Sequence, residues 1–186
     1  MCGHWAGCIN LTVFKIFSCP GLYFDLPEIV PDGLQGEFRF NRSDEPAVRF
    51  ASAETEVRAL VEGQMLAKRL HAETVGFSVT EESRILVTGG ASVNSAILQV
   101  IADVFNAGVF TQPAANSAAL GGAYRALAAS PGNSFALLAA RLAESCQQVA
   151  EPSRDAALVY GPLLERYRRA EQAALKTFAV NSSSSS

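Results

Sequence analysis

The feature that most constrains the fold is a strand–turn–helix segment near the middle of the chain. The run Arg84-Ile85-Leu86-Val87-Thr88 is short and nearly continuously apolar, which is typical of a strand covered on both faces. Gly89-Gly90 ends this run. An apolar stripe with helical spacing then predicts a helix; its members are Ile97, Val100, Ile101, Val104 and Phe105. A strand that leads through a glycine pair into a helix predicts an α/β protein.

The same turn has the chemistry of a nucleotide site. Two residues without bulky side chains let a flat ligand lie against the backbone, and a helix amino terminus offers free N–H groups to an anion. Ser92 is predicted to cap that helix. The chain contains no GxxxxGKS, GxxxxGKT or GxGxxG sequence, which excludes a P-loop and a Rossmann fingerprint. Glycine pairs are also common at strand–helix junctions for structural reasons, so the turn alone leaves both interpretations open.

The rest of the chain completes a mixed α/β pattern. Residues 55–75 show helical spacing of apolar side chains and end at Gly76, a natural helix stop. Alternation around Phe38 and Phe40 predicts a half-buried strand. A second short strand is predicted at 109–111, and further helices are predicted at 116–129, at 135–148 and through Tyr160 to Phe178. The economical architecture is a parallel or mixed sheet with covering helices.

Charge and composition exclude several classes of function. Lys and Arg number 15 against 18 Asp and Glu, a formal charge of -3, which gives no electrostatic footprint for nucleic acid. No apolar run reaches the roughly 18 residues of a membrane span, and the first twenty residues do not show the pattern of a signal peptide. There is no CxxC pair, and the two histidines lie far apart, so no metal site is predicted. We expect a cytoplasmic protein without a nucleic-acid or membrane partner.

Three motifs in order resemble the second half of the FGGY carbohydrate kinases. They are Gly89-Gly90-Ala91-Ser92-x-Asn94, then residues 97–105, then Ala115-Asn116-Ser117-Ala118-Ala119-Leu120-Gly121-Gly122-Ala123-Tyr124. Upstream, the residues between Gly21 and Pro31 and the run 56–64 resemble the xylulose kinases of animals in particular. The resemblance covers about residues 21–178. The ordered series of motifs is far more specific than the glycine pair alone.

The resemblance implies a fold, a reaction and a set of site residues. The fold would be part of an actin-like ATPase domain of the ribonuclease H-like class. The parent reaction would be phosphorylation of D-xylulose to D-xylulose 5-phosphate by ATP, with Mg in the complete enzyme. Gly89, Gly90, Ala91 and Asn94 would bind the adenosine part of ATP. Residues 119–123 would correspond to a helix motif near the interdomain hinge, where small residues let two helices cross closely.

The resemblance also implies an amino-terminally incomplete kinase. In the family, an amino-terminal domain supplies the first phosphate loop, most sugar contacts and an aspartate base, and none of these is recognised in the chain. No catalytic residue is therefore assigned, and the chain alone is expected to be inactive. We predict an unplaced segment at 1–20, an incomplete kinase domain at 21–180, and a disordered Ser tail at 181–186.

Two alternatives stay open at this stage. The chain could be a non-catalytic interaction module that self-associates through an exposed cleft face or binds a complete kinase. It could also derive from another FGGY kinase, such as a glycerol or ribulose kinase. Among single residues, Asp103 is interpreted as a solvated or capping carboxylate and His71 as a surface histidine. The aromatic pairs Phe38/Phe40 and Tyr160/Tyr167 are interpreted as packing residues.

Overall fold

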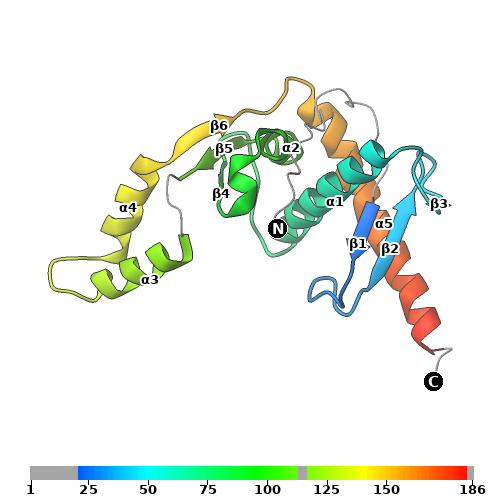
Figure 1. Cartoon of the computed structure of the whole chain (residues 1–186), viewed down its shortest axis with the longest axis horizontal. Coiled ribbons are helices and arrows are strands. Elements are labelled where there is room, and N and C mark those ends of the chain that lie inside the picture. Colours follow the sequence, from blue (N-terminus) through cyan, green and yellow to red (C-terminus); the bar gives the residue numbers. More distant parts are fainter. Residues whose placement is uncertain (1–20, 113–116, 184–186) are drawn as a thin grey trace, which may run out of the picture. The chain divides into compact units, whose positions relative to one another are not determined.

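The computed structural model describes residues 21–112 and 117–183, and the chain forms two compact units (Figure 1). Unit 1 comprises Met1–Val79 and Arg154–Ser186, and unit 2 comprises Thr80–Ser153. The predicted amino-terminal segment 1–20 and the last three serines of the predicted tail lie outside the described residues. Each unit is described below by itself.

Unit 1 contains a three-stranded antiparallel sheet. Its strands are β1 (Gly21–Phe24), β2 (Gly36–Phe40) and β3 (Pro46–Ala47), in the order β1-β2-β3. In the register of β1 and β2, Leu22 lies opposite Phe38. The strand predicted around Phe38 and Phe40 is thereby confirmed, and Phe40 is buried in the core.

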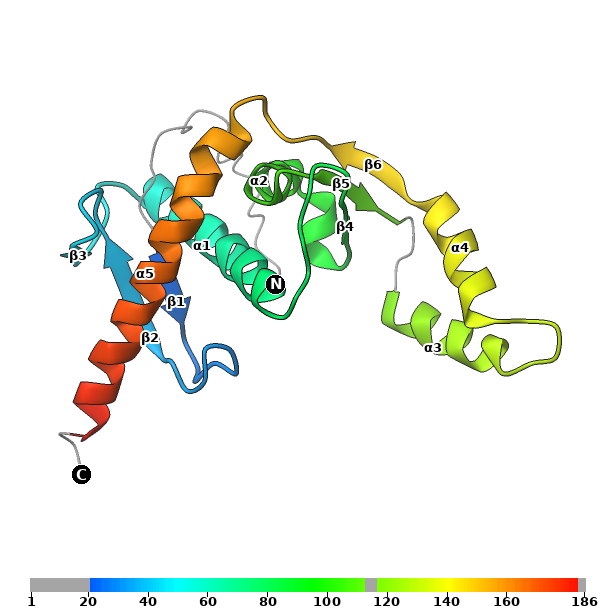
Figure 2. The ribbon, with the colours of Figure 1, turned by 180° about the vertical axis from the view of Figure 1, so that it is seen from behind.

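Two helices complete unit 1, and they lie side by side (Figures 1 and 2). Helix α1 (Ala53–Thr74) begins after Ser52, whose Oγ accepts a hydrogen bond from the Thr55 N–H. It ends just before Gly76, whose φ of 96° lies in the left-handed region that glycine adopts readily. Helix α5 (Ala156–Ser183) follows the end of unit 2 in the sequence. The predicted 55–75 helix and its glycine stop are therefore confirmed.

The core of unit 1 lies where α1, α5 and β1 meet. Leu22, Leu66 and Tyr167 are each no more than 1% exposed. Tyr160 on α5 is buried as well, which confirms that the tyrosine pair packs within the fold. Burial of this many large side chains is the main source of stability for a unit of this size.

Unit 2 contains a mixed sheet, as predicted from the sequence. Strands β4 (Arg84–Val87) and β5 (Gly108–Thr111) are parallel, and β6 (Gln147–Ala150) pairs with β5 in the antiparallel direction. Helix α2 (Ser95–Phe105) connects β4 to β5 and buries its predicted apolar stripe, including Val100, Ile101 and Val104. Helices α3 (Ser117–Ala128) and α4 (Phe135–Ser145) pack against each other.

Two predictions for unit 2 were wrong. Strand β4 is not covered on both faces: it forms one edge of the three-stranded sheet, and Leu86 is 46% exposed. The apolar run indicates a strand suited to burial, whereas among the described residues β4 pairs with β5 alone. The helix predicted at 135–148 ends at Ser145, because residues 147–150 pair with β5 as β6. The predicted start of the preceding helix at Asn116 lies outside the described residues.

Candidate functional site

The candidate site is the turn that joins β4 to α2. Gly89 has φ 78° and ψ −160°, a backbone conformation that glycine adopts without strain. Residues Gly90–Val93 then form a short 3-10 turn, labelled η2. The Ser92 hydroxyl donates a hydrogen bond to the Gly89 carbonyl oxygen over 2.7 Å, and the Ser92 N–H donates to the same oxygen over 3.1 Å. These two bonds fix the shape of the glycine turn.

The helix cap differs from the prediction. Asn94, not Ser92, caps α2: its Oδ1 accepts hydrogen bonds from the Ala96 and Ile97 N–H groups at 3.0 and 3.2 Å. The Ser92 hydroxyl is already committed to the glycine turn, so the 3-10 turn comes first and α2 begins at Ser95. Ser and Asn are both good cap residues, and the sequence did not distinguish between them.

The four residues predicted to bind adenosine are contiguous in space and accessible. Gly89, Gly90, Ala91 and Asn94 are all exposed. A Cβ atom added at Gly89 or Gly90 would meet no atom within 4 Å. Capping occupies the Asn94 oxygen, whereas its amide nitrogen donates no hydrogen bond within the described part of the chain. The turn thus offers an open backbone surface with a side-chain amide donor beside it.

Asp103, on α2, has a structural role that the sequence interpretation missed. It is 8% exposed, and its Oδ1 accepts hydrogen bonds from the Gln99 side chain at 3.0 Å and from the Ser153 N–H at 2.7 Å. The interpretation of Asp103 as a solvated or helix-capping carboxylate was wrong, because its partner Ser153 lies 50 residues away in the sequence. This carboxylate links α2 to the segment after β6.

The small-residue motif of α3 is not packed in this structure. Gly121 and Gly122 are exposed, and a Cβ atom added at either position would meet no atom within 4 Å. The close crossing of two helices that the family resemblance implied for residues 119–123 is therefore not made among the described residues. Within α3 no residue is fully buried.

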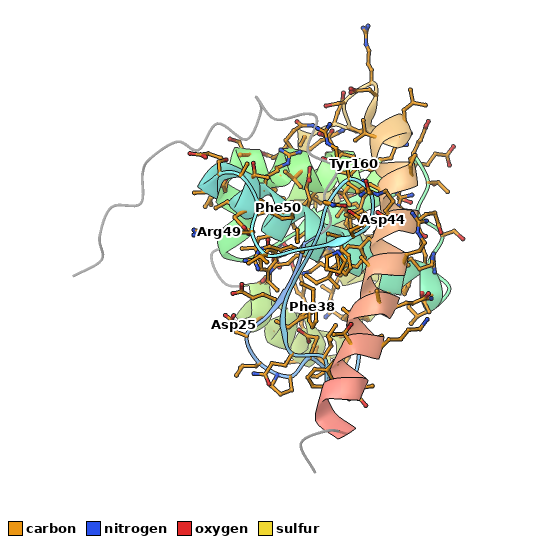
Figure 3. All side chains as sticks on the ribbon, turned by 90° about the vertical axis from the view of Figure 1, so that its right-hand side faces the viewer. Asp25, Phe38, Asp44, Arg49, Phe50 and Tyr160 are labelled. Atoms are coloured by element: carbon orange, nitrogen blue, oxygen red, sulfur yellow. The ribbon has the colours of Figure 1, made fainter. Side chains whose placement is uncertain are left out.

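Unit 1 carries two polar clusters that link elements distant in the sequence. Arg58 and Glu62 on α1 form an ion pair of 2.7 Å, and the Tyr160 hydroxyl of α5 donates to Glu62 over 2.6 Å. Burial, followed by the charge of Glu62, raises the pKa of Tyr160. The second cluster joins the turn after β2 to α5, where Arg166 and Arg169 donate to the two carboxylate oxygens of Asp44 at 2.7 and 2.6 Å. Figure 3 labels Asp44, which lies beside α5.

His71 also differs from its interpretation as a surface histidine. Its side chain is 25% exposed, and its Nε2 lies 2.9 Å from the Glu171 Oε1 on α5. The charged neighbours Lys68 and Arg69 suggested a solvated face, but the histidine closes the contact between the two helices of unit 1. The partner is 100 residues away in the sequence, and no local signal identified it.

The described residues show neither a metal centre nor a membrane span. Within the ranges 21–112 and 117–183, no three His, Cys, Asp or Glu side chains gather into a group that could hold a metal ion. Among the same residues, no helix combines the length and the apolar character needed to cross a membrane.

Comparison with known proteins identifies relatives over most of the chain. Xylulose kinase from Mus musculus is 44% identical over 160 residues, which cover 84% of this chain and 28% of the relative. Xylulose kinase from Rattus norvegicus is 44% identical over 155 residues, covering 82% of this chain and 28% of the relative. Xylulose kinase 2 from Arabidopsis thaliana is 40% identical over 116 residues, covering 57% and 21%. The chain thus spans less than a third of the length of these relatives.

Two solved structures share the fold. The xylulose kinase from Brucella ovis matches with a TM-score of 0.59 at 18% identity, over 86% of this chain and 32% of that chain. The xylulose kinase from Rhodospirillum rubrum matches with a TM-score of 0.50 at 20% identity, over 82% and 30%. These sugar kinases have the actin-like ATPase fold, which confirms the fold class predicted from the sequence.

A family model also matches part of the chain. The FGGY family of carbohydrate kinases, C-terminal domain, matches residues 41–130. This range includes the glycine turn after β4 and the small-residue motif of α3, both of which carried the sequence resemblance. Residues 41–130 of this chain are therefore similar to the carboxy-terminal domain of the FGGY family of carbohydrate kinases.

Proposed function

We propose that this chain supplies the adenosine side of the ATP site of a sugar kinase. The parent reaction would be the phosphorylation of D-xylulose to D-xylulose 5-phosphate by ATP, as the names of the similar kinases suggest. One observation carries the proposal: within the matched family domain, the turn Gly89–Asn94 presents an open backbone at the carboxyl end of a parallel strand. Ligands of open α/β sheets bind at that end of the strands.

The geometry suggests how adenosine would be held. The flat base and the ribose would lie against the backbone of Gly89, Gly90 and Ala91; the lack of neighbouring atoms at the two glycines and the exposure of Ala91 leave room for them. The amide nitrogen of Asn94 would donate a hydrogen bond to the nucleoside, while its oxygen keeps the cap of α2. Mg²⁺ would accompany the ATP phosphates. The described residues form no group of metal ligands, and we assign no contact with that ion to this chain.

Nucleotide binding can be tested with a charge placed in the turn. In Gly90→Asp the new carboxylate enters open space, so the fold is expected to persist while nucleotide binding is lost. Ala139→Asp, on the exposed surface of α4, adds the same charge away from the turn and serves as the control. Fluorescent ATP analogue binding to the purified chain would be measured for all three proteins. Unchanged affinity of Gly90→Asp would exclude the site.

We further propose that the chain alone does not turn over substrate and acts in the cytoplasm, the compartment expected from its sequence. Phosphoryl transfer needs a base for the sugar hydroxyl as well as held phosphates and a metal ion. Asp103, the acidic residue nearest in sequence after the turn, is buried and already hydrogen-bonded. An ADP-release assay with ATP and D-xylulose is expected to show no sugar-dependent rate; measurable xylulose-dependent turnover would contradict this part of the proposal.

A second candidate function is a non-catalytic interaction module. It is favoured by apolar side chains of unit 2 that are open to solvent: Leu86 is 46%, Phe135 63% and Leu137 47% exposed. Large apolar side chains that are open to solvent contribute to association surfaces where they form a continuous patch. Size-exclusion chromatography with light scattering distinguishes the two candidates, because self-association supports the module and a monomer at all concentrations counts against it.

A further inference from the structure

Unit 1 contains a concave site that the proposed nucleotide turn does not use. This β1 pocket, of about 360 Å³, is bounded by strand β1, by one face of α1 and by Tyr167 of α5. All of its lining residues belong to unit 1, whereas the turn Gly89–Asn94 belongs to unit 2. Sites for small ligands have volumes from roughly 300 Å³ upwards, so the β1 pocket is large enough for a small molecule.

A glycine on α1 brings the two main walls of the pocket together. A Cβ atom at Gly63 would collide with the carbonyl oxygen of Gly21 and would lie 3.8 Å from the Tyr167 ring. Strand β1 therefore runs directly against the helix. Within the described residues β1 pairs only with β2, so the backbone groups along its other edge have no strand partner. Such an edge offers hydrogen bonds to a ligand.

Tyr167 supplies the observation that points to a ligand. The residue is 1% exposed, yet its hydroxyl makes no hydrogen bond among the described residues. Burial, and then the charge of Glu171, raises the pKa of this phenol. Among the described residues, every side-chain polar atom that is fully inaccessible to solvent has a hydrogen-bond partner. Because the Tyr167 oxygen has none, it is at least slightly accessible. The space that Tyr167 lines is the β1 pocket, and buried tyrosine hydroxyls normally find a partner.

The polar wall of the β1 pocket comes from one stripe of α1. Gln64, Lys68 and His71 follow one another at spacings of four and three residues, which places them on the same helix face. Gln64 and Lys68 make no side-chain hydrogen bond or ion pair within the described residues, and the His71 Nε2 lies 2.9 Å from the Glu171 Oε1. Glu28, from the loop after β1, adds a carboxylate to the lining.

The chemistry of this lining favours a neutral ligand rich in hydroxyl groups. The lining of the pocket contains one positive side chain, Lys68, and one negative side chain, Glu28. The pocket as a whole therefore favours neither an anionic nor a cationic ligand. A hydroxyl group can accept from an ammonium and donate to a carboxylate, and it can do both with Gln64 and Tyr167. We propose that the β1 pocket binds a neutral polyhydroxylated molecule of about monosaccharide size, with the Tyr167 hydroxyl as a central hydrogen-bond partner.

Titration of the ¹⁵N-labelled full chain with xylitol and with D-glucose tests this proposal. Amide shifts are expected at β1 and along residues 63–71, with affinity on the order of millimolar, as is usual for few polar contacts. Tyr167→Phe removes only the hydroxyl, and affinity should fall by about fivefold or more, the equivalent of one hydrogen bond. Tyr124→Phe, on α3 of unit 2, is the matched control and should leave binding unchanged.

Three outcomes would overturn the proposal. They are the absence of shifts with both neutral probes, equal affinity of Tyr167→Phe and the parent chain, and binding of succinate alone, which would make the pocket an anion site. If Tyr167→Phe unfolds, as judged by circular dichroism, Gln64→Ala and Lys68→Ala replace it, because both side chains are exposed and neither supports the core. ATP binding at Gly89–Asn94 is read from different amides, so the two proposals can fail independently.

Discussion

The two units of this molecule use their apolar residues differently. In unit 1, α1, α5 and β1 bury one another, and the buried cluster of Arg58, Glu62 and Tyr160 joins the two helices. In unit 2, α2 is buried against the sheet, but strand β4 is open at one edge and neither α3 nor α4 has more than one buried residue. The helices of unit 1 therefore bury one another through a shared core, whereas α3 and α4 of unit 2 bury few of their residues among the described residues.

The largest expected effect concerns the buried ion pair of unit 1. Glu62→Gln leaves Arg58 buried without its countercharge, and the loss of a partner from a buried pair costs about 3–5 kcal/mol. Glu73→Gln is the matched control, because Arg69 and Glu73 form the same i,i+4 pair on the same helix with a more exposed carboxylate. That change should cost about 0–1 kcal/mol. Urea unfolding of both variants measures the difference. Equal losses of unfolding free energy would contradict the claim that the Arg58–Glu62 pair is buried between the helices of unit 1.

The second prediction compares leucines on strands of the two units. Leu22→Ala, at a position 1% exposed on β1, creates a cavity and should destabilise unit 1 by about 2–5 kcal/mol. Leu86→Ala, at a position 46% exposed on β4, should cost less than about 1 kcal/mol in the isolated chain. Hydrogen exchange resolved by residue would assign each loss to its unit. A large loss from Leu86→Ala would show that β4 is covered in solution.

The same glycine-to-alanine substitution should destabilise a helix of unit 1 and stabilise a helix of unit 2. Gly63→Ala forces a Cβ against the Gly21 carbonyl, and such overpacking costs about 1–3 kcal/mol. Gly122→Ala, in the interior of α3 where the Cβ meets open space, should instead stabilise its helix by about 0.5–1 kcal/mol. Thermal unfolding followed by circular dichroism would record both. A destabilising Gly122→Ala would indicate that α3 is packed by a surface outside the described residues.

The smallest predicted effect is a pH dependence confined to unit 1. Burial would raise the pKa of Glu56, but hydrogen bonds from the Phe50 N–H, Arg39 and Tyr23 outweigh it and hold the pKa below the ordinary value of 4.5. A lowered folded pKa contributes stability that is fully present above pH 4.5 and is lost as the pH falls through the folded pKa. The midpoint of unfolding should therefore decrease as the pH is lowered below 4.5.

Glu56→Gln provides the control for this pH dependence. The variant lacks the titrating group, so its midpoint should fall less steeply over the same acid range, while the unit 2 signals in hydrogen exchange stay unaffected. A parent chain and a variant with identical profiles would show that Glu56 contributes nothing to the acid response.

Local patterns in the sequence predicted a helix or strand well where apolar residues recur at a regular spacing or in a continuous run. The stripe from Ile97 to Phe105 gave α2, and the run before Gly89 gave β4, because periodicity and breakers report local structure directly. Strand β6 was missed because Gln147 and Gln148 carry no apolar alternation, and only pairing with β5 defines the strand. Ser92 and Asn94 are equally suitable caps, and the choice between them was made by the hydrogen bond to Gly89.

Long-range contacts account for the residues of the site and the core that the sequence did not reveal. Asp103 meets Ser153, His71 meets Glu171 and Arg58 meets Tyr160 across 50 to 102 residues, so no local spacing signals them. The apolar run of β4 reports a strand suited to burial, but not whether a partner is present. The four residues assigned to adenosine come from family resemblance, and the structure adds that they form one exposed turn.

The most direct test of the central claim is an ATP titration of the ¹⁵N-labelled chain followed by residue-resolved NMR. The expected result is a set of concentration-dependent shifts at the amides of Gly89 to Ile97, with the signals of α1 and α5 unchanged. Saturable shifts that fall only in unit 1, or no shifts at millimolar ATP, would contradict the assignment of the turn between β4 and α2 as the adenosine side of a kinase site.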